Sequence, residues 1–133
     1  MSIFNFFKKQ RKQVLVIDDD DSIRRQISFR LERHENITVF KARNGERGIL
    51  SAIEKEPDLI ILDWMLPDIL GPAVLSELKK AASTKHIPVL MLTGKDKVGD
   101  IEDAFKLGAE GYLTKPFQLQ KLGEKVTNML TLQ

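Results

Sequence analysis

The sequence predicts an α/β fold in which five strands alternate with five helices, a (βα)5 arrangement. Short apolar runs recur along the chain, and the segments between them carry apolar residues at helical spacing. Proline and glycine stand where elements should stop: Pro57, Pro88 and Pro116 flank predicted strands, and Gly108 follows a predicted helix. Strands that alternate with helices form a doubly wound parallel sheet with helices on both faces.

The predicted strands are short and mostly aliphatic. They cover residues 14–17, 37–40, 59–62, 89–92 and, with a weaker pattern, 111–114. Three of them are almost unbroken aliphatic runs, which is typical of strands that are buried on both faces of a sheet.

The helices between these strands are indicated by apolar residues that return every three or four positions. In chain order the marker residues are Ile23, Ile27 and Leu31; Ile49, Leu50 and Ile53; Val74, Leu75 and Leu78; Ile101, Ala104, Phe105 and Leu107; and Leu119, Leu122, Val126, Met129 and Leu130. The last helix runs to the end of the sequence, which we interpret as leaving no room for an output domain.

Length and composition set the broad class. The 133 residues amount to one domain, and the absence of cysteine excludes disulfides and thiolate metal sites. No apolar run approaches the length of about 18 residues that a membrane span needs. Together with the missing cysteine, this favours a cytoplasmic location.

The net charge of +2 conceals an asymmetry. A leader, residues 1–12, holds four cations and no acid, whereas the domain, residues 13–133, holds 17 basic and 19 acidic side chains. The mildly acidic domain is not typical of a nucleic-acid binder.

The leader places an apolar stretch, Ile3–Phe7, before its cations, which is the wrong order for a secretory signal. It is either a frayed or self-packed extension, an amphipathic turn on an anionic membrane, or a docking segment. Its role stays open.

Polar residues follow four of the five predicted strands, at the edge where functional groups gather in open parallel sheets. In chain order they are Asp18, Asp19, Asp20 and Asp21, then Asp63, Thr93 and Lys115. Grouped carboxylates repel one another unless a cation holds them, and an oxygen-only site suits Mg²⁺. A lysine and a hydroxyl opposite them would bind an anion such as a phosphoryl group. We interpret Asp20 and Asp21 as a helix start, where acids are favoured.

Four motifs at this edge carry a family resemblance. They are Val16-Ile17-Asp18-Asp19, Leu62-Asp63-Trp64-Met65-Leu66-Pro67, Leu92-Thr93-Gly94 and Gly111-Tyr112-Leu113-Thr114-Lys115-Pro116-Phe117. In order and spacing they resemble the response-regulator receiver family of two-component signalling, in particular its stand-alone chemotaxis-like members, over roughly residues 13 to 131. Each motif alone is weak, but the four together are specific. The resemblance implies a flavodoxin-like sheet of order 2-1-3-4-5.

The resemblance also implies the roles of the acids. Asp63 would be the phosphoacceptor. Asp19 and Asp63 would ligate Mg²⁺, for which Mn²⁺ can substitute, together with the backbone carbonyl of Met65. Asp18 would act largely through water.

The remaining motif residues would handle the phosphoryl group and the response to it. The resemblance implies that Lys115 pairs with one phosphoryl oxygen, while the Thr93 hydroxyl and the Gly94 backbone N–H bind the others. Thr93 and Tyr112 would form the switch, and the Lys115–Pro116 bond would be cis. One departure is Leu70, which stands where many members have an acid before the loop glycine.

The expected function is that of a phosphorylation switch rather than an enzyme. A histidine kinase or a histidine phosphotransfer protein would donate the phosphoryl group, and the domain would promote its own phosphorylation and dephosphorylation. The fourth helix, fifth strand and fifth helix would then change their binding to a downstream protein. We expect a monomer or weak dimer that does not bind nucleic acid.

Three other functions fit the sequence less well. A Mg²⁺-dependent phosphatase with an aspartyl nucleophile needs a second acid two residues after the nucleophile, where this chain has Met65. A flavodoxin-like FMN carrier needs a hydroxyl- and glycine-rich loop where this chain has four acids. A pseudo-receiver scaffold is disfavoured by the complete set of motif residues. The sequence does not identify the kinase, the downstream target or the pathway, or whether the chain is full length.

Overall fold

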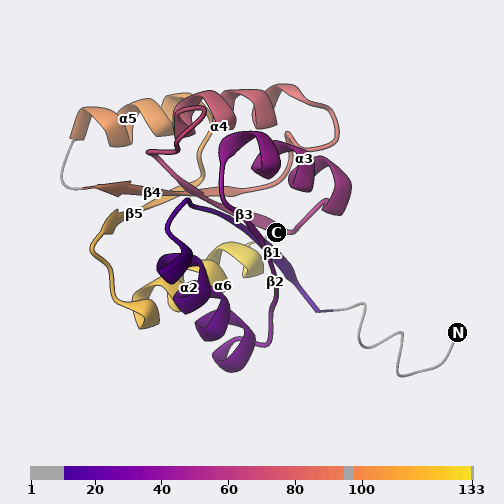
Figure 1. The fold of residues 1–133 in the computed structure, drawn as a ribbon, viewed down its shortest axis with the longest axis vertical. Coiled ribbons are helices and arrows are strands. Elements are labelled where there is room, and N and C mark those ends of the chain that lie inside the picture. The colour runs from indigo at the N-terminus through magenta and orange to yellow at the C-terminus, as the bar shows by residue number, and fades with distance from the viewer. Residues whose placement is uncertain (1–10, 95–97, 133) are drawn as a thin grey trace, which may run out of the picture.

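A computed structural model describes residues 11–94 and 98–132, and it shows the predicted alternation of strands and helices (Figure 1). The elements are β1 (Gln13–Ile17), α2 (Asp21–His34), β2 (Thr38–Ala42), α3 (Gly45–Lys55), β3 (Leu59–Asp63), α4 (Gly71–Lys80), β4 (Val89–Gly94), α5 (Val98–Lys106), β5 (Gly111–Lys115) and α6 (Leu119–Thr131). The fourth and fifth predicted helices are therefore α5 and α6. The apolar part of the leader, Ile3–Phe7, lies outside the described residues.

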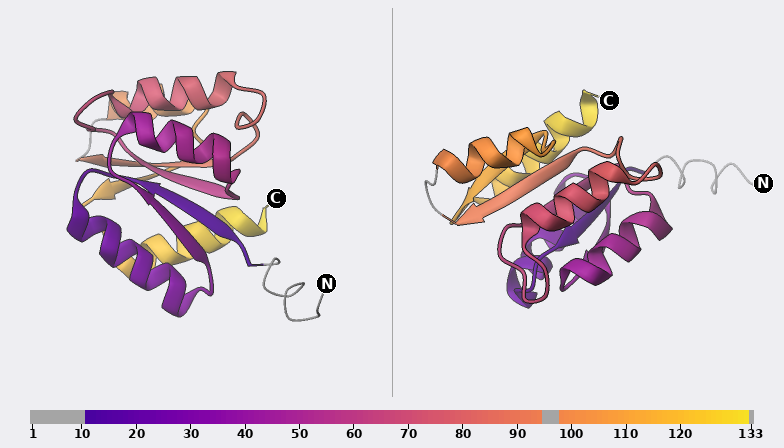
Figure 2. Two further views of the ribbon diagram at one scale, coloured as in Figure 1. Left: turned by 45° about the vertical axis from the view of Figure 1, so that its right-hand side comes forward. Right: turned by 90° about the horizontal axis from the view of Figure 1, so that it is seen from above.

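The five strands form one parallel sheet in the order β2-β1-β3-β4-β5. This confirms the order 2-1-3-4-5 that the resemblance implied. Helices α3, α4 and α5 cover one face of the sheet, and α2 and α6 cover the other (Figures 1 and 2). Within the described part of the chain, no helix combines the length and the apolar character needed to cross a membrane.

The sheet separates two apolar cores. Side chains alternate along each strand, so Leu15 and Ile17 of β1 join the core beneath α3, α4 and α5, whereas Val14 and Val16 join the core beneath α2 and α6. Strands β1, β3 and β4 lie inside the sheet and are almost entirely buried. This explains why their sequences are unbroken aliphatic runs.

The edge strand β2 differs from its prediction. It covers 38–42 rather than 37–40, because pairing with β1 continues until Ala42 meets Ile17. Lys41 is tolerated in the strand because its side chain is exposed. Ile37 is buried but precedes the strand, and its N–H donates to the carbonyl of Leu31 at the end of α2.

Helix α3 turns a different face to the sheet than its large apolar residues indicate. Gly48 and Ala52 are buried, while Leu50 and Ile53 are 59% and 46% exposed. A Cβ atom added at Gly48 would lie 2.5 Å from Cδ1 of Ile17. The close packing of α3 on β1 therefore depends on small residues. Leu50 and Ile53 face outward, whereas Ile49 packs against the core as its helical spacing predicts.

Candidate functional site

The polar residues of the four motifs meet where the carboxyl ends of the strands share one edge. Asp63 ends β3, Thr93 lies near the end of β4, and Lys115 ends β5, while Asp18 directly follows β1. Asp18, Asp63 and Thr93 are buried, with exposed fractions of 0%, 5% and 2%. Such burial of carboxylates requires compensating partners.

Lys115 provides that compensation. Its Nζ lies 2.9 Å from Oδ2 of Asp18 and 3.1 Å from Oδ1 of Asp63. The ammonium therefore bridges acids that belong to two different strands. Because the Lys115 side chain keeps 23% of its surface exposed, the site is open to solvent on this side.

The three acids fit a hard divalent cation. Asp18, Asp19 and Asp63 can each offer a carboxylate oxygen such that all three atoms lie within 4.8 Å of one another. Two of these acids are buried and Asp19 is exposed, so the cluster is reachable from solvent. With all three ionised, Lys115 neutralises only one charge, and an oxygen-only donor set with excess negative charge suits Mg²⁺.

The electrostatics of the cluster appear in two pKa values. Burial and then the charge of Asp18 raise the pKa of Asp63 from 3.8 to about 6, although Lys115 acts in the opposite direction. For Lys115, burial alone would lower the pKa. The hydrogen bond to Asp18 and the charge of Asp63 outweigh burial and raise it, so the ammonium stays protonated.

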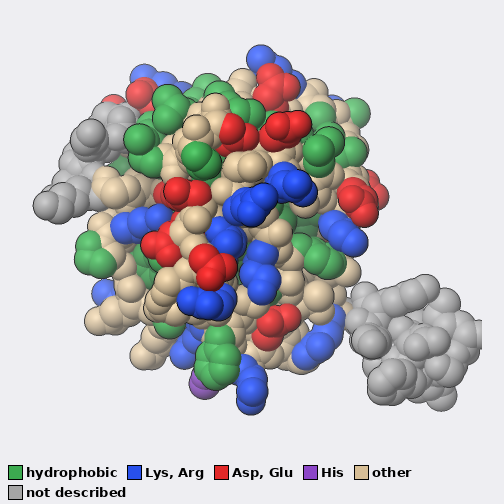
Figure 3. Space-filling view, in the orientation of Figure 1, with side chains coloured by type: hydrophobic (Ala, Val, Ile, Leu, Met, Phe, Trp, Pro, Cys, Tyr) green, Lys and Arg blue, Asp and Glu red, His purple; other side chains and the backbone are tan. Residues whose placement is uncertain are grey.

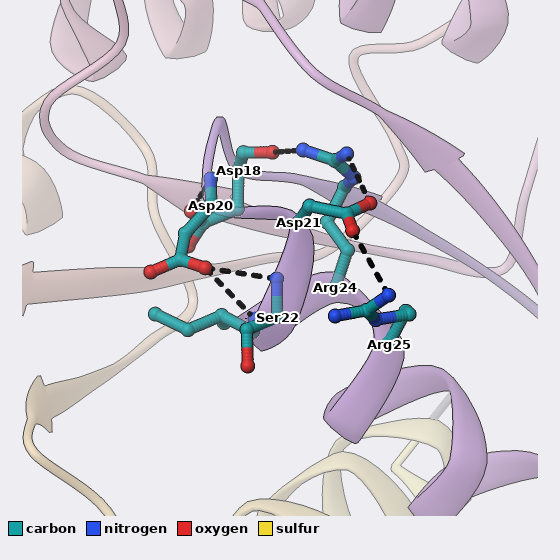
Figure 4. Close-up of polar contacts among 7 residues, drawn as sticks. Asp18, Asp20, Asp21, Ser22, Arg24 and Arg25 are labelled. Carbon is teal, nitrogen blue, oxygen red and sulfur yellow. Dashed lines mark hydrogen bonds and ion pairs between the residues drawn. The ribbon is translucent and has the colours of Figure 1, made fainter.

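The turn that carries Asp18 is held by hydrogen bonds that Figure 4 draws. The N–H of Asp20 donates to Oδ1 of Asp18 at 2.9 Å, and the Arg24 guanidinium donates to the backbone carbonyl of Asp18 at 2.6 Å. A second Arg24 nitrogen lies 2.9 Å from Oδ1 of Asp21. Sequence reasoning missed Arg24, and its only signal is a cation six residues after the first acid of the cluster.

Asp20 and Asp21 belong to the helix start, as predicted. The Asp20 side chain caps α2 by accepting from the N–H groups of Ser22 and Ile23, at 2.9 and 3.2 Å. Asp21 lies in the first turn and pairs with Arg24 and, at 3.3 Å, with Arg25. The side chains of these two acids therefore stabilise the start of α2.

The other end of the site combines a buried hydroxyl with open space. Among the described residues, Oγ1 of Thr93 is buried and has no hydrogen-bond partner. A Cβ atom added at Gly94 would meet nothing within 4 Å, so the backbone there is accessible. Tyr112 is 37% exposed and packs edge-on against Phe105, with ring centroids 5.6 Å apart.

The loop after Asp63 is fixed by its own backbone. The N–H of Gly71 donates to the carbonyl of Trp64 at 2.7 Å, and a Cβ atom at Gly71 would lie 2.4 Å from the carbonyl oxygen of Asp63. Only glycine fits this approach, and the neighbouring Leu70 contributes no side-chain hydrogen bond as the cap of α4. In the same loop, the Met65 side chain is exposed.

The same loop also reaches α3. Asp68 accepts hydrogen bonds from the N–H groups of Gly45 and Glu46 at 2.8 and 2.9 Å.

The Lys115–Pro116 peptide bond, directly after β5, is cis, as the resemblance implied.

Comparison with known proteins gives a consistent result. The family model described as the response regulator receiver domain matches residues 14–127. The DNA-binding dual master transcriptional regulator RpaA of Synechocystis is 39% identical over 118 residues, which cover 89% of this chain and 48% of that protein. The alkaline phosphatase synthesis transcriptional regulatory protein PhoP of Bacillus subtilis is 38% identical over 119 residues, with coverage of 90% and 48%. The chain thus spans about half the length of these curated relatives.

Solved structures agree with the fold. A putative response regulator from Chloroflexus aurantiacus is similar with a TM-score of 0.86 and 32% identity, covering 92% of this chain and 99% of that one. A CheY-like response regulator receiver domain protein from Methanospirillum hungatei gives a TM-score of 0.85 and 26% identity, with coverage of 92% and 96%.

Proposed function

The chain belongs to the response regulator receiver domain family of two-component signalling, and we propose that it takes a phosphoryl group onto Asp63 from a histidine kinase or a histidine phosphotransfer protein. The observation that carries this proposal is the placement of the Lys115 ammonium 2.9 Å from Asp18 and 3.1 Å from Asp63. A cation held beside a buried carboxylate stabilises the negative charge that a phosphoryl group brings.

In the proposed reaction, a carboxylate oxygen of Asp63 attacks the phosphorus of the donor's phosphohistidine. An oxygen–phosphorus bond forms while the phosphorus–nitrogen bond breaks, and the imidazole leaves with the bonding electron pair. Lys115 then pairs with one phosphoryl oxygen, while the Thr93 hydroxyl and the Gly94 N–H donate to the others. Transfer of this kind depends mainly on positioning and charge neutralisation, which these groups provide.

The acid cluster supports a Mg²⁺ requirement, with Mn²⁺ as a substitute. Asp19, Asp63 and the backbone carbonyl of Met65 would hold the ion, and Asp18 would contribute largely through water. When bound, the ion supplies charge neutralisation for the transferred group. The excess negative charge of Asp18, Asp19 and Asp63 is the feature that favours this assignment.

The proposed output is a change in protein binding on the face formed by α5, β5 and α6. Engagement of the Thr93 hydroxyl would alter the packing beside it, and Tyr112 on β5 would respond. Tyr112, Phe105 and Leu107 are exposed apolar residues of this region and offer a surface for a downstream protein. Hydrolysis promoted by the domain would restore the resting form.

The wider arrangement is proposed as follows. Residues 13–133 act as one cytoplasmic receiver unit, a monomer or weak dimer that does not contact nucleic acid, and residues 1–12 form a separate basic leader. The family match over residues 14–127 and the start of β1 at Gln13 support this division.

Acetyl phosphate with Mg²⁺, followed by intact-mass measurement, tests the phosphoacceptor. The wild-type protein should gain the mass of one phosphoryl group, and Asp63→Asn should gain none. Asp103→Asn, which removes an exposed acid on α5, should still be phosphorylated. A phosphorylated Asp63→Asn protein would refute the assignment.

A further inference from the structure

A basic pocket of about 620 Å³ lies beside the acid turn, between the first turns of α2, the end of β2 and the outer face of α3. Four cations line it: Arg24, Lys41, Arg43 and Arg47. Figure 3 shows several Lys and Arg side chains near the middle of the drawn face, with Asp and Glu side chains beside them. None of the motif residues of the phosphorylation site lines the pocket.

The acids in the pocket wall are already engaged by other contacts. Asp21 pairs with Arg24 and Arg25, and Glu54 lies 3.8 Å from the Lys55 ammonium. In the part of the chain that the structure describes, Lys41, Arg43 and Arg47 have no such acidic partner. These three side chains are exposed, and they bring unneutralised positive charge to one concave surface.

The backbone explains why the three cations converge. Lys41 lies near the end of β2 and Arg43 directly follows the strand, and both side chains line the pocket. Arg47 lies in the first turn of α3, which follows directly. Like charges brought together in this way repel one another, and a bound anion relieves that repulsion.

We propose that this pocket binds a small molecule that carries a pyrophosphate group, such as a nucleoside diphosphate. Three unpaired cations match the charge of linked phosphates better than that of a single phosphate, and the guanidinium groups of Arg43 and Arg47 suit bidentate binding of phosphate oxygens. The volume falls in the range of about 300–1,000 Å³ that small-molecule sites occupy. Leu50, which is exposed in the pocket wall, offers an apolar surface for the organic part of the ligand.

The pocket is physically continuous with the acid turn. Arg24 forms part of its wall and also donates to the backbone carbonyl of Asp18. A ligand in the pocket would therefore be separated from the Asp18 turn of the phosphorylation site by the Arg24 side chain.

Binding can be tested by titrating ADP, AMP and pyrophosphate into the ¹⁵N-labelled protein in Mg²⁺-free, low-salt buffer and following amide shifts. ADP and pyrophosphate should shift the amides of Arg43, Arg47 and Ser51 saturably, and AMP should bind more weakly. Lys41→Gln/Arg43→Gln/Arg47→Gln should weaken ADP binding by about tenfold or more. Arg43→Gln alone should weaken it less.

A matched control removes the same charge elsewhere. Lys80→Gln/Lys85→Gln/Lys121→Gln changes three exposed cations outside the pocket and should bind ADP as the wild type does. Phosphorylation by acetyl phosphate checks that both triple variants are folded. The proposal is overturned by equal affinity for ADP and AMP, by shifts centred on Lys115 and Thr93, or by equal loss in both triple variants. Tighter binding of a hexaglutamate peptide than of ADP would also overturn it.

Discussion

Arg24 and Asp18 are joined by a 2.6 Å hydrogen bond from a side-chain guanidinium to a backbone carbonyl. The bond ties the first turn of α2 to the residue that directly follows β1. Only 13% of the Arg24 side chain is exposed, so this contact is shielded from competing water. Arg24 therefore positions the acid turn without being one of the acids.

Arg24→Gln should weaken Mg²⁺ binding a few-fold and lower the free energy of unfolding by about 1–2 kcal/mol, because a charge-assisted hydrogen bond to Asp18 is lost. Titration of Trp64 fluorescence with Mg²⁺ measures the first effect, since Trp64 is partly buried beside Asp63. Arg25→Gln is the control, because its partner Asp21 is exposed. Similar Mg²⁺ affinities for the two variants would contradict a positioning role for Arg24.

The raised pKa of Asp63 predicts a pH-dependent penalty in the metal-free protein. The folded state keeps the proton up to about pH 6, whereas the unfolded chain releases it near 3.8. Between these values the folded state binds more protons, so this group lowers the free energy of unfolding as the pH rises. Asp63→Asn should therefore be more stable than wild type at neutral pH, by on the order of 2 kcal/mol.

Denaturant unfolding at several pH values, without Mg²⁺, measures this difference. The gap between Asp63→Asn and wild type should be small near pH 4 and should reach its plateau above pH 6. Subtracting the two curves removes the titration of other groups. A gap that stays constant with pH would show that burial of the ionised Asp63 carboxylate is not its origin.

Gly71→Ala should disturb the loop after Asp63, because the added Cβ would lie 2.4 Å from the Asp63 carbonyl oxygen and 2.8 Å from Cα of Trp64. Both of these are backbone atoms, so the loop itself must move, at a cost of about 1–3 kcal/mol. The midpoint temperature of thermal unfolding should fall, and acetyl phosphate should phosphorylate a smaller fraction of the protein. Gly94→Ala is the matched control and should unfold as wild type does, since its Cβ would meet nothing within 4 Å.

Asp68→Ala should loosen the start of α3. Hydrogen bonds from the N–H groups of Glu46 and Gly45 lower the pKa of Asp68, so its contribution to stability is present above the ordinary pKa of 3.8 and is lost as the pH falls through the lowered value. Amide hydrogen exchange at Gly45 and Glu46 should become faster. Asp68→Asn, which keeps one acceptor oxygen, should show a smaller effect, and amides near Lys55 should be unchanged.

Sequence reasoning could assemble much of the site because strand order and strand ends define it. Asp18, Asp63 and Lys115 each follow or end a strand, and a parallel sheet brings such positions to one edge. Their contacts at 2.9 and 3.1 Å confirm the expected convergence. The fold was predictable because strands that are buried on both faces appear in the sequence as short aliphatic runs.

Other features depend on packing that has no local signal. Asp68 accepts hydrogen bonds from the first turn of a helix that begins 23 residues earlier in the chain, and Arg24 binds a carbonyl group, which any residue could supply. The outward orientation of Leu50 could not be read from its helical spacing, because Gly48 decides which side of α3 approaches the sheet.

The separation of the interior into two cores has a consequence for how this protein can evolve. Side chains of Leu15 and Val16 are neighbours in sequence but belong to opposite layers. Substitutions in separate layers that share no contacts should add in their effects on stability. Natural variation can therefore repack the core beneath α3, α4 and α5 without compensating changes in the core beneath α2 and α6.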